Sequence, residues 1–289
     1  MNVLACPICN SQSSFLRDYP HKARENELGI KSIAECEICG VAFAYPLPAQ
    51  SLVDAFYQNG SYWLKSGAPT RAGHLHSKNQ ALIRVRWIKR YIVSIPELIL
   101  DIGAGYGWQA DALKKEFPIG IKSYSFVEPD PVAVKSIYAR LNKRFPIKTP
   151  KLNSQEKYDL VFLNQVLEHV VDPIKFVDKI KANMGKKCLL YLEIPNQDYK
   201  FKQDVFPHLF FYDKNSLLFF VNKLGLEVIA LEEFGSIKKN KFLTFFALFI
   251  FRLSIALRLN FLGAFFDTFL WGYKKESRGI WLRALLRVS

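Results

Sequence analysis

The sequence of 289 residues has few acidic side chains, few histidines and no long apolar run in its most apolar region. Its 26 acidic residues face 40 basic ones, which leaves a formal net charge of +14. A positive charge of this size favours an acidic partner, such as RNA, an anionic membrane or a phosphorylated substrate. With five histidines, the chain has few side chains suited to proton transfer near neutral pH.

The N-terminus, MNVLACPICN, lacks the basic stretch and apolar run of a secretory signal. We therefore expect a cytoplasmic protein whose thiols stay reduced. Four of the five cysteines form two C-x-x-C pairs, Cys6 with Cys9 and Cys36 with Cys39. Reduced thiols in such pairs are typical of metal ligands rather than disulfides. Cys188, in the apolar run KKCLLYLEI, is expected to be an inert core thiol.

Internal repeats and low-complexity linkers are also absent, whereas half of the residues are apolar and 15% are aromatic. Such a composition excludes disorder and allows a sizeable core. Between 97 and 235, apolar runs alternate with helical patterns: ELILDIG, SYSFVEP, YDLVFLNQ, CLLYLEIPN and LEVIALEEFG. Strands of this kind predict a doubly wound, mostly parallel α/β sheet. We expect a module at 1–47, connecting helices at 48–96 and the main domain at 97–289.

The stretch LILDIGAGYG predicts a strand, a tight turn and a helix. Gly103, Ala104 and Gly105 allow the backbone to turn sharply and to approach a ligand. A nicotinamide-binding turn would have the pattern G-x-G-x-x-G, but Trp108 stands in place of its third glycine. The turn is therefore expected to bind a different ligand.

Two carboxylates indicate which ligand. Asp101 ends the strand before the turn, where it would repel a pyrophosphate and attract a cation. S-adenosylmethionine carries two cationic groups, an amino group and a sulfonium. Glu128 ends the next strand, 27 residues later, and is placed to accept hydrogen bonds from ribose hydroxyls.

These features, together with YDLVFLNQVLEHVVDP after the fourth strand, resemble the class I S-adenosylmethionine-dependent methyltransferases over residues 97–235. The resemblance implies a Rossmann-like fold and S-adenosylmethionine as cofactor. It places Asn153 and Ser154 near the adenine. The residues that it implies at the cofactor are Asp101, Gly103, Ala104, Gly105, Glu128, Asn164 and Gln165, of which the last two border the methyl-transfer site.

The two cysteine pairs are separated by 26 residues, and four thiolates from two such knuckles close a tetrahedral zinc site. Protein fills all four positions, so we expect a structural zinc, with four free core thiols as the alternative. The stretch CEICGVAFAYPLPAQSLVDAFYQNGSYW resembles the N-terminal zinc module of some bacterial methyltransferases, including sugar C-methyltransferases. Those proteins usually carry a further large C-terminal domain. This chain has about 54 residues there, which puts C-methylation of a free nucleotide sugar in doubt.

Candidates for catalysis lie after the fourth and fifth strands. His208, in DVFPHLFFYDKNSL, is the first choice for a general base; alternatively it orients the following helix, with Asp213 as N-cap. His169, in LEHVVDP, is a second candidate with a structural alternative. Tyr212 and Glu193 are further candidates for contacts with the acceptor.

A catalytic metal is a further alternative at this position. Some related quinone O-methyltransferases hold magnesium with E-x-x-E-H. Here Gln165 replaces the first carboxylate of that pattern, which argues against a catalytic metal.

The segment 236–289 holds ten basic residues, two acidic residues and nine phenylalanines. Its longest uncharged run, from Phe242 to Phe251, has ten residues, whereas a bilayer span needs ~20. An apolar face with basic edges would suit an interfacial helix on anionic lipid. Packing against the domain or a second subunit is the alternative. We expect a helical insertion at about 236–276 and a final strand in SRGIWLRALLRV.

The expected function is methylation of a saccharide acceptor, either a nucleotide sugar or a lipid-linked glycan of surface polysaccharide biosynthesis. The alternatives are an RNA methyltransferase, which the zinc module and the charge suit, and a lipid or quinone O-methyltransferase. A binding protein with an inactive methyltransferase fold is a third. Peripheral contact with the inner face of the membrane through 236–276 is expected for a lipid-linked acceptor, and nucleic acid stays an open alternative partner.

Overall fold

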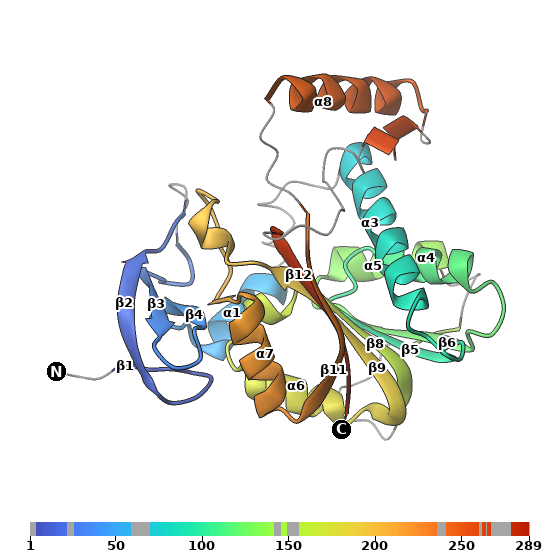
Figure 1. The fold of residues 1–289 in the computed structure, drawn as a ribbon. Coiled ribbons are helices and arrows are strands. Elements are labelled where there is room, and N and C mark those ends of the chain that lie inside the picture. The colour runs from blue at the N-terminus through green and yellow to red at the C-terminus, as the bar shows by residue number, and fades with distance from the viewer. Residues whose placement is uncertain are drawn as a thin grey trace.

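The computed structural model describes residues 4–21, 26–58, 70–141, 146–148, 156–235, 241–259, 262–263, 265–266 and 279–288, with the backbone alone for 241–247. Two sheets organise these residues (Figure 1). A seven-stranded sheet has the order β11-β12-β9-β8-β5-β6-β7, and a five-stranded sheet has the order β1-β2-β3-β4-β10.

The seven-stranded sheet contains the expected parallel strands. These are β5 (Leu98–Ile102), β6 (Ser123–Val127), β7 (Ile147–Lys148), β8 (Tyr158–Asn164) and β9 (Met184–Pro195). The C-terminal strand β12 (Trp281–Val288) runs antiparallel between β9 and β11 (Leu226–Phe234). The predicted class, a mostly parallel Rossmann-like α/β fold, is confirmed.

Helices cover both faces of this sheet, which is why its central strands are apolar on both sides. One face packs on α3 (Arg71–Lys89), α4 (Trp108–Glu116) and α5 (Pro131–Leu141). The other face packs on α6 (Pro173–Lys181) and α7 (Lys214–Lys223). Side chains cap three of these helices at their N-termini, because Thr70, Asp172 and Asp213 each accept a bond from a backbone N–H of the first turn.

The five-stranded sheet joins the N-terminal region to the rest of the chain. Its strands are β1 (Leu4–Ala5), β2 (Gln12–Asp18), β3 (Ser32–Cys36), β4 (Ala42–Tyr45) and β10 (Phe210–Phe211). Strand β10 belongs to the segment between β9 and α7, and it pairs antiparallel with β4. The residues predicted as a separate module thus share a sheet with the main domain.

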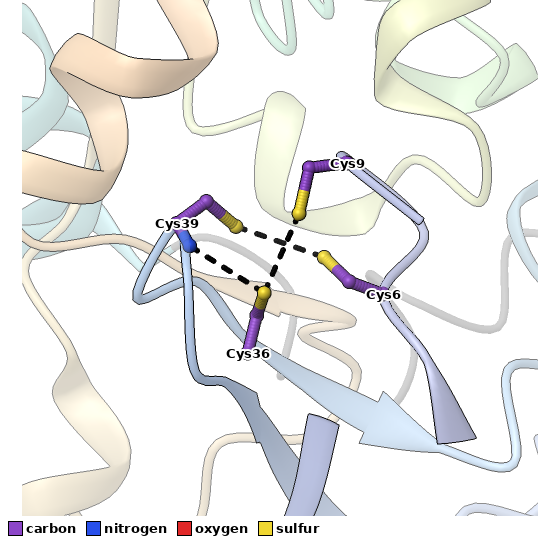
Figure 2. A group of neighbouring side chains, drawn as sticks. All are labelled: Cys6, Cys9, Cys36 and Cys39. Atoms are coloured by element: carbon purple, nitrogen blue, oxygen red, sulfur yellow. Dashed lines mark hydrogen bonds between the residues drawn. The ribbon is translucent and has the colours of Figure 1, made fainter. Parts of the chain in front are cut away.

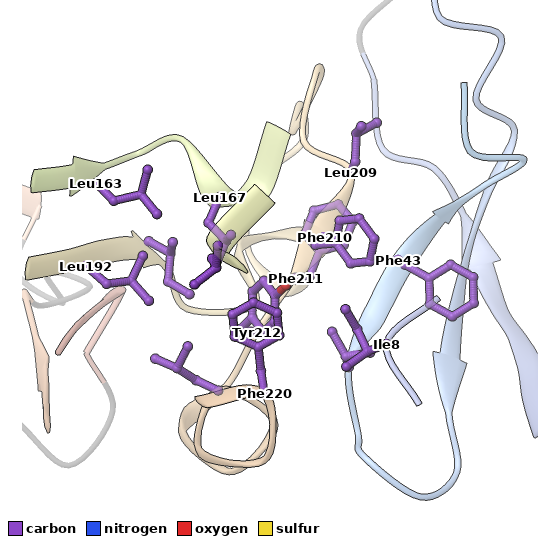
Figure 3. Packing of buried hydrophobic residues seen from close by; sticks show 14 of the residues in the cluster. Ile8, Phe43, Leu163, Leu167, Leu192, Leu209, Phe210, Phe211, Tyr212 and Phe220 are labelled. Atoms are coloured by element: carbon purple, nitrogen blue, oxygen red, sulfur yellow. The ribbon is translucent and has the colours of Figure 1, made fainter. Parts of the chain in front are cut away.

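One hydrophobic core continues from this small sheet into the large one (Figure 3). Ile8 and Phe43 of the N-terminal region belong to the same buried cluster as Leu163 and Leu192 of the large sheet. The helix α1 (Gln50–Gln58) adds Val53 and Phe56 to this cluster. The composition break near residue 47 is therefore not a break in the packing.

The helix α8 (Lys241–Ala256) stands apart from both sheets and lies against the N-terminal end of α3 (Figure 1). Its Phe251 packs on Ala72 and Leu75 of α3. The rest of the insertion predicted at 236–276 lies largely outside the described residues. Within the part of the chain that the structure describes, no helix is long and apolar enough to cross a membrane.

Candidate active site

A cavity of about 990 Å³ opens at the carboxyl ends of β5, β6 and β8. Open α/β sheets bind their ligands at this edge, where successive strand-to-helix loops meet. All seven residues that the sequence places at a cofactor line the cavity: Asp101, Gly103, Ala104, Gly105, Glu128, Asn164 and Gln165. Asn153 and Ser154, expected near an adenine, lie outside the described residues.

The glycine turn is shaped by a close approach that excludes side chains. Gly103 has a φ of 70°, and a Cβ atom built on it would collide with Cγ2 of Val166. Gly105, with a φ of 53°, donates its backbone N–H to Oε2 of Glu128 at 2.7 Å. The turn therefore presents bare backbone to the cavity and holds the carboxylate of the next strand beside it.

Asp101 is a buried carboxylate that has room for a cationic partner. Its Oδ2 accepts a hydrogen bond of 2.5 Å from the Tyr124 hydroxyl, while Oδ1 has no hydrogen-bond partner among the described residues. Burial raises the pKa of Asp101 to about 7, although the Tyr124 hydrogen bond and the charge of Arg84 act in the opposite direction. A ligand ammonium group would satisfy Oδ1 and stabilise the ionised form.

The carboxylate of Glu128 has the geometry to bind a vicinal diol. Its Oε1 accepts the N–H of Asp130 at 3.0 Å, and its Oε2 accepts the N–H of Gly105 at 2.7 Å. Each oxygen keeps a second lone pair for a ligand hydroxyl. Burial raises the pKa of Glu128, while the two backbone hydrogen bonds lower it. An ammonium site at Asp101 and a diol site at Glu128 fit the amino group and the ribose of S-adenosylmethionine.

Arg84 of α3 is a cavity residue that the sequence did not reveal. Its Nε and Nη2 atoms donate to Oε1 of Glu193 at 3.0 and 2.5 Å. Glu193 also accepts from the Tyr191 hydroxyl at 2.7 Å and does not itself line the cavity. Glu193, which we expected at the acceptor, instead holds Arg84 in place. No local pattern marks this pair, because its members lie 109 residues apart.

The two candidate histidines are neighbours, but only His169 lines the cavity. Their ring centroids are 4.8 Å apart, in an edge-to-face arrangement. Burial and the charge of His208 lower the pKa of His169 to about 3, so that His169 stays neutral. Nδ1 of His208 lies 3.1 Å from Oδ2 of Asp198, which also accepts from Lys202 at 2.8 Å. Asp198 is fully buried, and no motif in the sequence marks it.

The two histidines and the neighbouring Glu168 bear on the question of a catalytic metal. Ligand atoms of Glu168, His169 and His208 lie within 4.8 Å of one another. Both carboxylate oxygens of the buried Glu168 lack a hydrogen-bond partner among the described residues. The expectation that the chain has no catalytic metal therefore stays a prediction.

Tyr212 does not reach the cavity. It is fully buried, with its ring 6.3 Å from that of Phe210 and 5.5 Å from that of Phe220. Burial raises the pKa of its hydroxyl well above the usual range. The next residue, Asp213, caps α7 in a reciprocal pair with Ser216, as we expected for this helix. The structure therefore gives Tyr212 a place in the core rather than at the acceptor.

Four cysteines form a compact cluster at the N-terminal sheet (Figure 2). The Sγ atoms of Cys6 and Cys39 are 3.6 Å apart, those of Cys9 and Cys36 are 3.4 Å apart, and all four lie within 4.8 Å of one another. Sulfur atoms bound at about 2.3 Å to one tetrahedral zinc are roughly 3.8 Å apart. The cluster is therefore compatible with a zinc module.

A family model and several solved structures are similar to this chain. The family model described as a methyltransferase domain matches residues 85–231, just over half of the chain. Similar solved structures include a methyltransferase from Leishmania major that depends on S-adenosylmethionine (12% identity, 74% of each chain, TM-score 0.48) and coclaurine N-methyltransferase (17% identity, 71% of each chain, TM-score 0.47). Mitomycin 7-O-methyltransferase is similar over 75% of this chain and 55% of its own (13% identity, TM-score 0.49).

A search of curated protein sequences gave no match. The family match and the cavity at the glycine turn rest on the same residues, since 85–231 contains all seven of the expected cofactor positions. The chain belongs to the methyltransferase domain family and is an S-adenosylmethionine-dependent methyltransferase.

Proposed function

We propose that this methyltransferase modifies a saccharide acceptor, either a nucleotide sugar or a lipid-linked glycan used in surface polysaccharide biosynthesis. The observation that carries the proposal is the position of the cysteine module, whose sequence resembles that of sugar methyltransferases. Its strand β4 pairs with β10, so the module borders the segment that contains His208. The Tyr19 hydroxyl of the module donates to the backbone carbonyl of His208 at 2.8 Å. The module thereby supports the acceptor side of the site.

In this proposal the four cysteines hold a structural zinc ion. Thiolates from Cys6, Cys9, Cys36 and Cys39 would fill all four positions of a tetrahedral site and leave none for a reacting water. The ion would fix the two knuckles relative to β3 and β4, and through β10 it would stabilise the His208 segment.

The cavity residues would orient the cofactor through its charged and hydroxyl groups. Asp101 would accept a hydrogen bond from the ammonium group of the cofactor, and Glu128 would accept hydrogen bonds from its ribose hydroxyls. Arg84 would face the carboxylate of the cofactor. Bound S-adenosylmethionine supplies an electrophilic methyl group on its sulfonium. The bare turn of Gly103 and Gly105 lets the cofactor approach the backbone.

A proton must leave the acceptor hydroxyl when oxygen gains a methyl group. His169 lines the cavity in its neutral form and can take this proton at one ring nitrogen. The ring of His208 packs edge-to-face against that of His169, and its Nδ1 lies 3.1 Å from Oδ2 of Asp198. We infer that a ring nitrogen of neutral His169 takes the proton and passes it to solvent, while His208, held beside Asp198, fixes the orientation of the His169 ring.

Two other acceptors remain as candidates. A lipid or quinone is favoured by the exposed apolar face of α8, and RNA is favoured by the charge of +14. The acceptor can be identified with methyl-tritiated S-adenosylmethionine and extracts of cells that lack the protein. The extracts are then separated into RNA, lipid-soluble, polysaccharide and small-molecule fractions.

A parallel reaction with Asp101→Asn sets the background of this experiment. Label in the polysaccharide fraction, or in lipid-soluble material that mild acid converts to labelled sugar, supports a saccharide acceptor. Acid-stable lipid label favours the lipid or quinone alternative. Label in RNA overturns the saccharide proposal.

A further inference from the structure

The outer face of α8 is apolar and exposed. Phe249 and Leu253 of the helix and Leu257, one residue past its end, follow one another at intervals of four residues, and they are 56%, 42% and 59% exposed. Residues spaced by four lie on one side of a helix. The opposite side is covered, because Phe251 is buried against Ala72 and Leu75 of α3 and Ser254 is buried as well. Leu262 and Phe265, just beyond the helix, extend the apolar surface.

The charged side chains described at this surface have one sign. Within 248–259, 262–263 and 265–266, the charged residues are Arg252 and Arg258. Arg252 and Arg258 are exposed beside the apolar row. A protein partner would place hydrophobic groups on this face without needing such a bias, whereas an anionic lipid surface matches both the apolar row and the positive charge.

The dimensions of α8 decide how it would meet a membrane. Its 16 residues extend over about 24 Å, less than the ~30 Å of a hydrocarbon core. Arg252 interrupts the apolar sequence of the helix, and one side of the helix is already packed on α3. The helix therefore suits a position along the interface, with its outer face directed toward the acyl chains.

We propose that α8 docks this enzyme on an anionic membrane surface, with Phe249, Leu253 and Leu257 inserted at the headgroup boundary and Arg252 and Arg258 bound to lipid phosphates. This docking goes beyond the saccharide proposal, because it concerns where the enzyme works and holds for any acceptor that the membrane carries.

The helix α3 connects the docking face to the cavity. Leu75 of α3 contacts Phe251 of α8, while Ser77, Ala81 and Arg84 of the same helix line the cavity. At 1.5 Å per residue, these positions lie within roughly 14 Å of Leu75 along the helix axis. Docking through α8 would thus hold the methyl-transfer cavity close to the membrane surface, where a lipid-linked acceptor carries its reactive group.

Vesicle binding by the full-length, metal-loaded protein tests the proposal. Sedimentation is measured with vesicles of phosphatidylcholine alone and with vesicles that contain 30% phosphatidylglycerol. We expect at least tenfold stronger binding to the anionic vesicles at low salt, and a loss of most of this preference when Arg252→Glu and Arg258→Glu are combined. Phe249→Asp with Leu253→Asp should weaken binding to the anionic vesicles at least tenfold.

The matched control is Val93→Asp with Ile119→Asp, which alters two side chains that are 102% and 82% exposed and do not lie on α8. This control should bind vesicles as the wild type does. A further variant, Phe249→Trp, keeps the helix apolar; its emission minus that of the wild type, which already has five tryptophans, should be blue-shifted and quenched by brominated lipids.

Two results would overturn the docking proposal: equal loss of binding in the control and in the α8 variants, or no binding by wild type. A concentration-dependent dimer in light scattering that Phe249→Asp and Leu253→Asp abolish would overturn it too, because a second copy would then cover the face. Label in RNA with vesicle binding intact would refute the saccharide proposal alone.

Discussion

Acidification should weaken cofactor binding because of Asp101. The ionised carboxylate is the form that attracts an ammonium group, and burial raises the pKa of Asp101 to about 7. Since this pKa belongs to an acid, the ionised form is lost as the pH falls through about 7. The stable product analogue S-adenosylhomocysteine keeps the ammonium and the ribose, so it reports on this contact without turnover.

The size of the effect follows from the ionisation of Asp101. The ammonium group of S-adenosylhomocysteine belongs to a free amino acid and stays charged below pH ~8, where roughly 0.9 of Asp101 is ionised. With Asp101 at about 7, that fraction falls to roughly 0.09 at pH ~6 and to roughly 0.01 at pH ~5. The Kd should therefore rise about tenfold at pH ~6 and about 90-fold at pH ~5 relative to pH ~8.

Isothermal titration calorimetry between pH ~5 and ~8 measures this profile. Asp101→Asn should bind more weakly at neutral pH and lose most of the acid limb. Tyr124→Phe removes a hydrogen bond that lowers the pKa of Asp101, so its acid limb should move to higher pH. The exposed Asp178→Asn should change nothing. A Kd that stays constant down to pH ~5 in the wild type, or an unchanged acid limb in Asp101→Asn, would refute the reasoning.

Three further changes test the rest of the site. Gly103→Ala places a methyl group against Val166 at a φ of 70°. Urea unfolding should show that the free energy of unfolding falls by at least about 2 kcal/mol. Adding Val166→Ala should restore part of this stability, and no recovery would exclude the clash as the cause. Cys36→Ser should abolish the one bound zinc measured by mass spectrometry and lower the Tm, whereas full zinc content would contradict the assignment. Asp198→Asn should leave the Kd for S-adenosylhomocysteine within about twofold but lower kcat about 100-fold and shift the pH–rate profile; an unchanged kcat would exclude its role in holding His208.

The sequence predicted the large sheet well because its signals are local. Each apolar run between 97 and 235 became a strand, and the turn from Gly103 to Gly105 lies where the strand-turn-helix pattern put it. Asp101 and Glu128 were predicted correctly as cavity residues because the ends of strands can be recognised from the sequence alone.

The missed residues depend on contacts between distant segments. Arg84 meets Glu193 only when α3 packs across β9, and Asp198 meets His208 only through the fold of one irregular segment. Tyr212 stands four residues after His208, but its ring packs with those of Phe210 and Phe220 in the core, a contact that only the folded chain brings about. No periodicity in the sequence encodes these pairings.

The pairing of β4 with β10 limits how this protein can be recombined. A chimera that replaces residues 1–47 alone would set foreign backbone against Phe210 and Phe211, whose partners are Phe43 and Ala42. The two segments form one unit of exchange although about 160 residues separate them in the chain. A swap of acceptor specificity between relatives should therefore carry both segments together, and a truncated catalytic domain that starts after residue 47 would have an unpaired strand beside its own histidines.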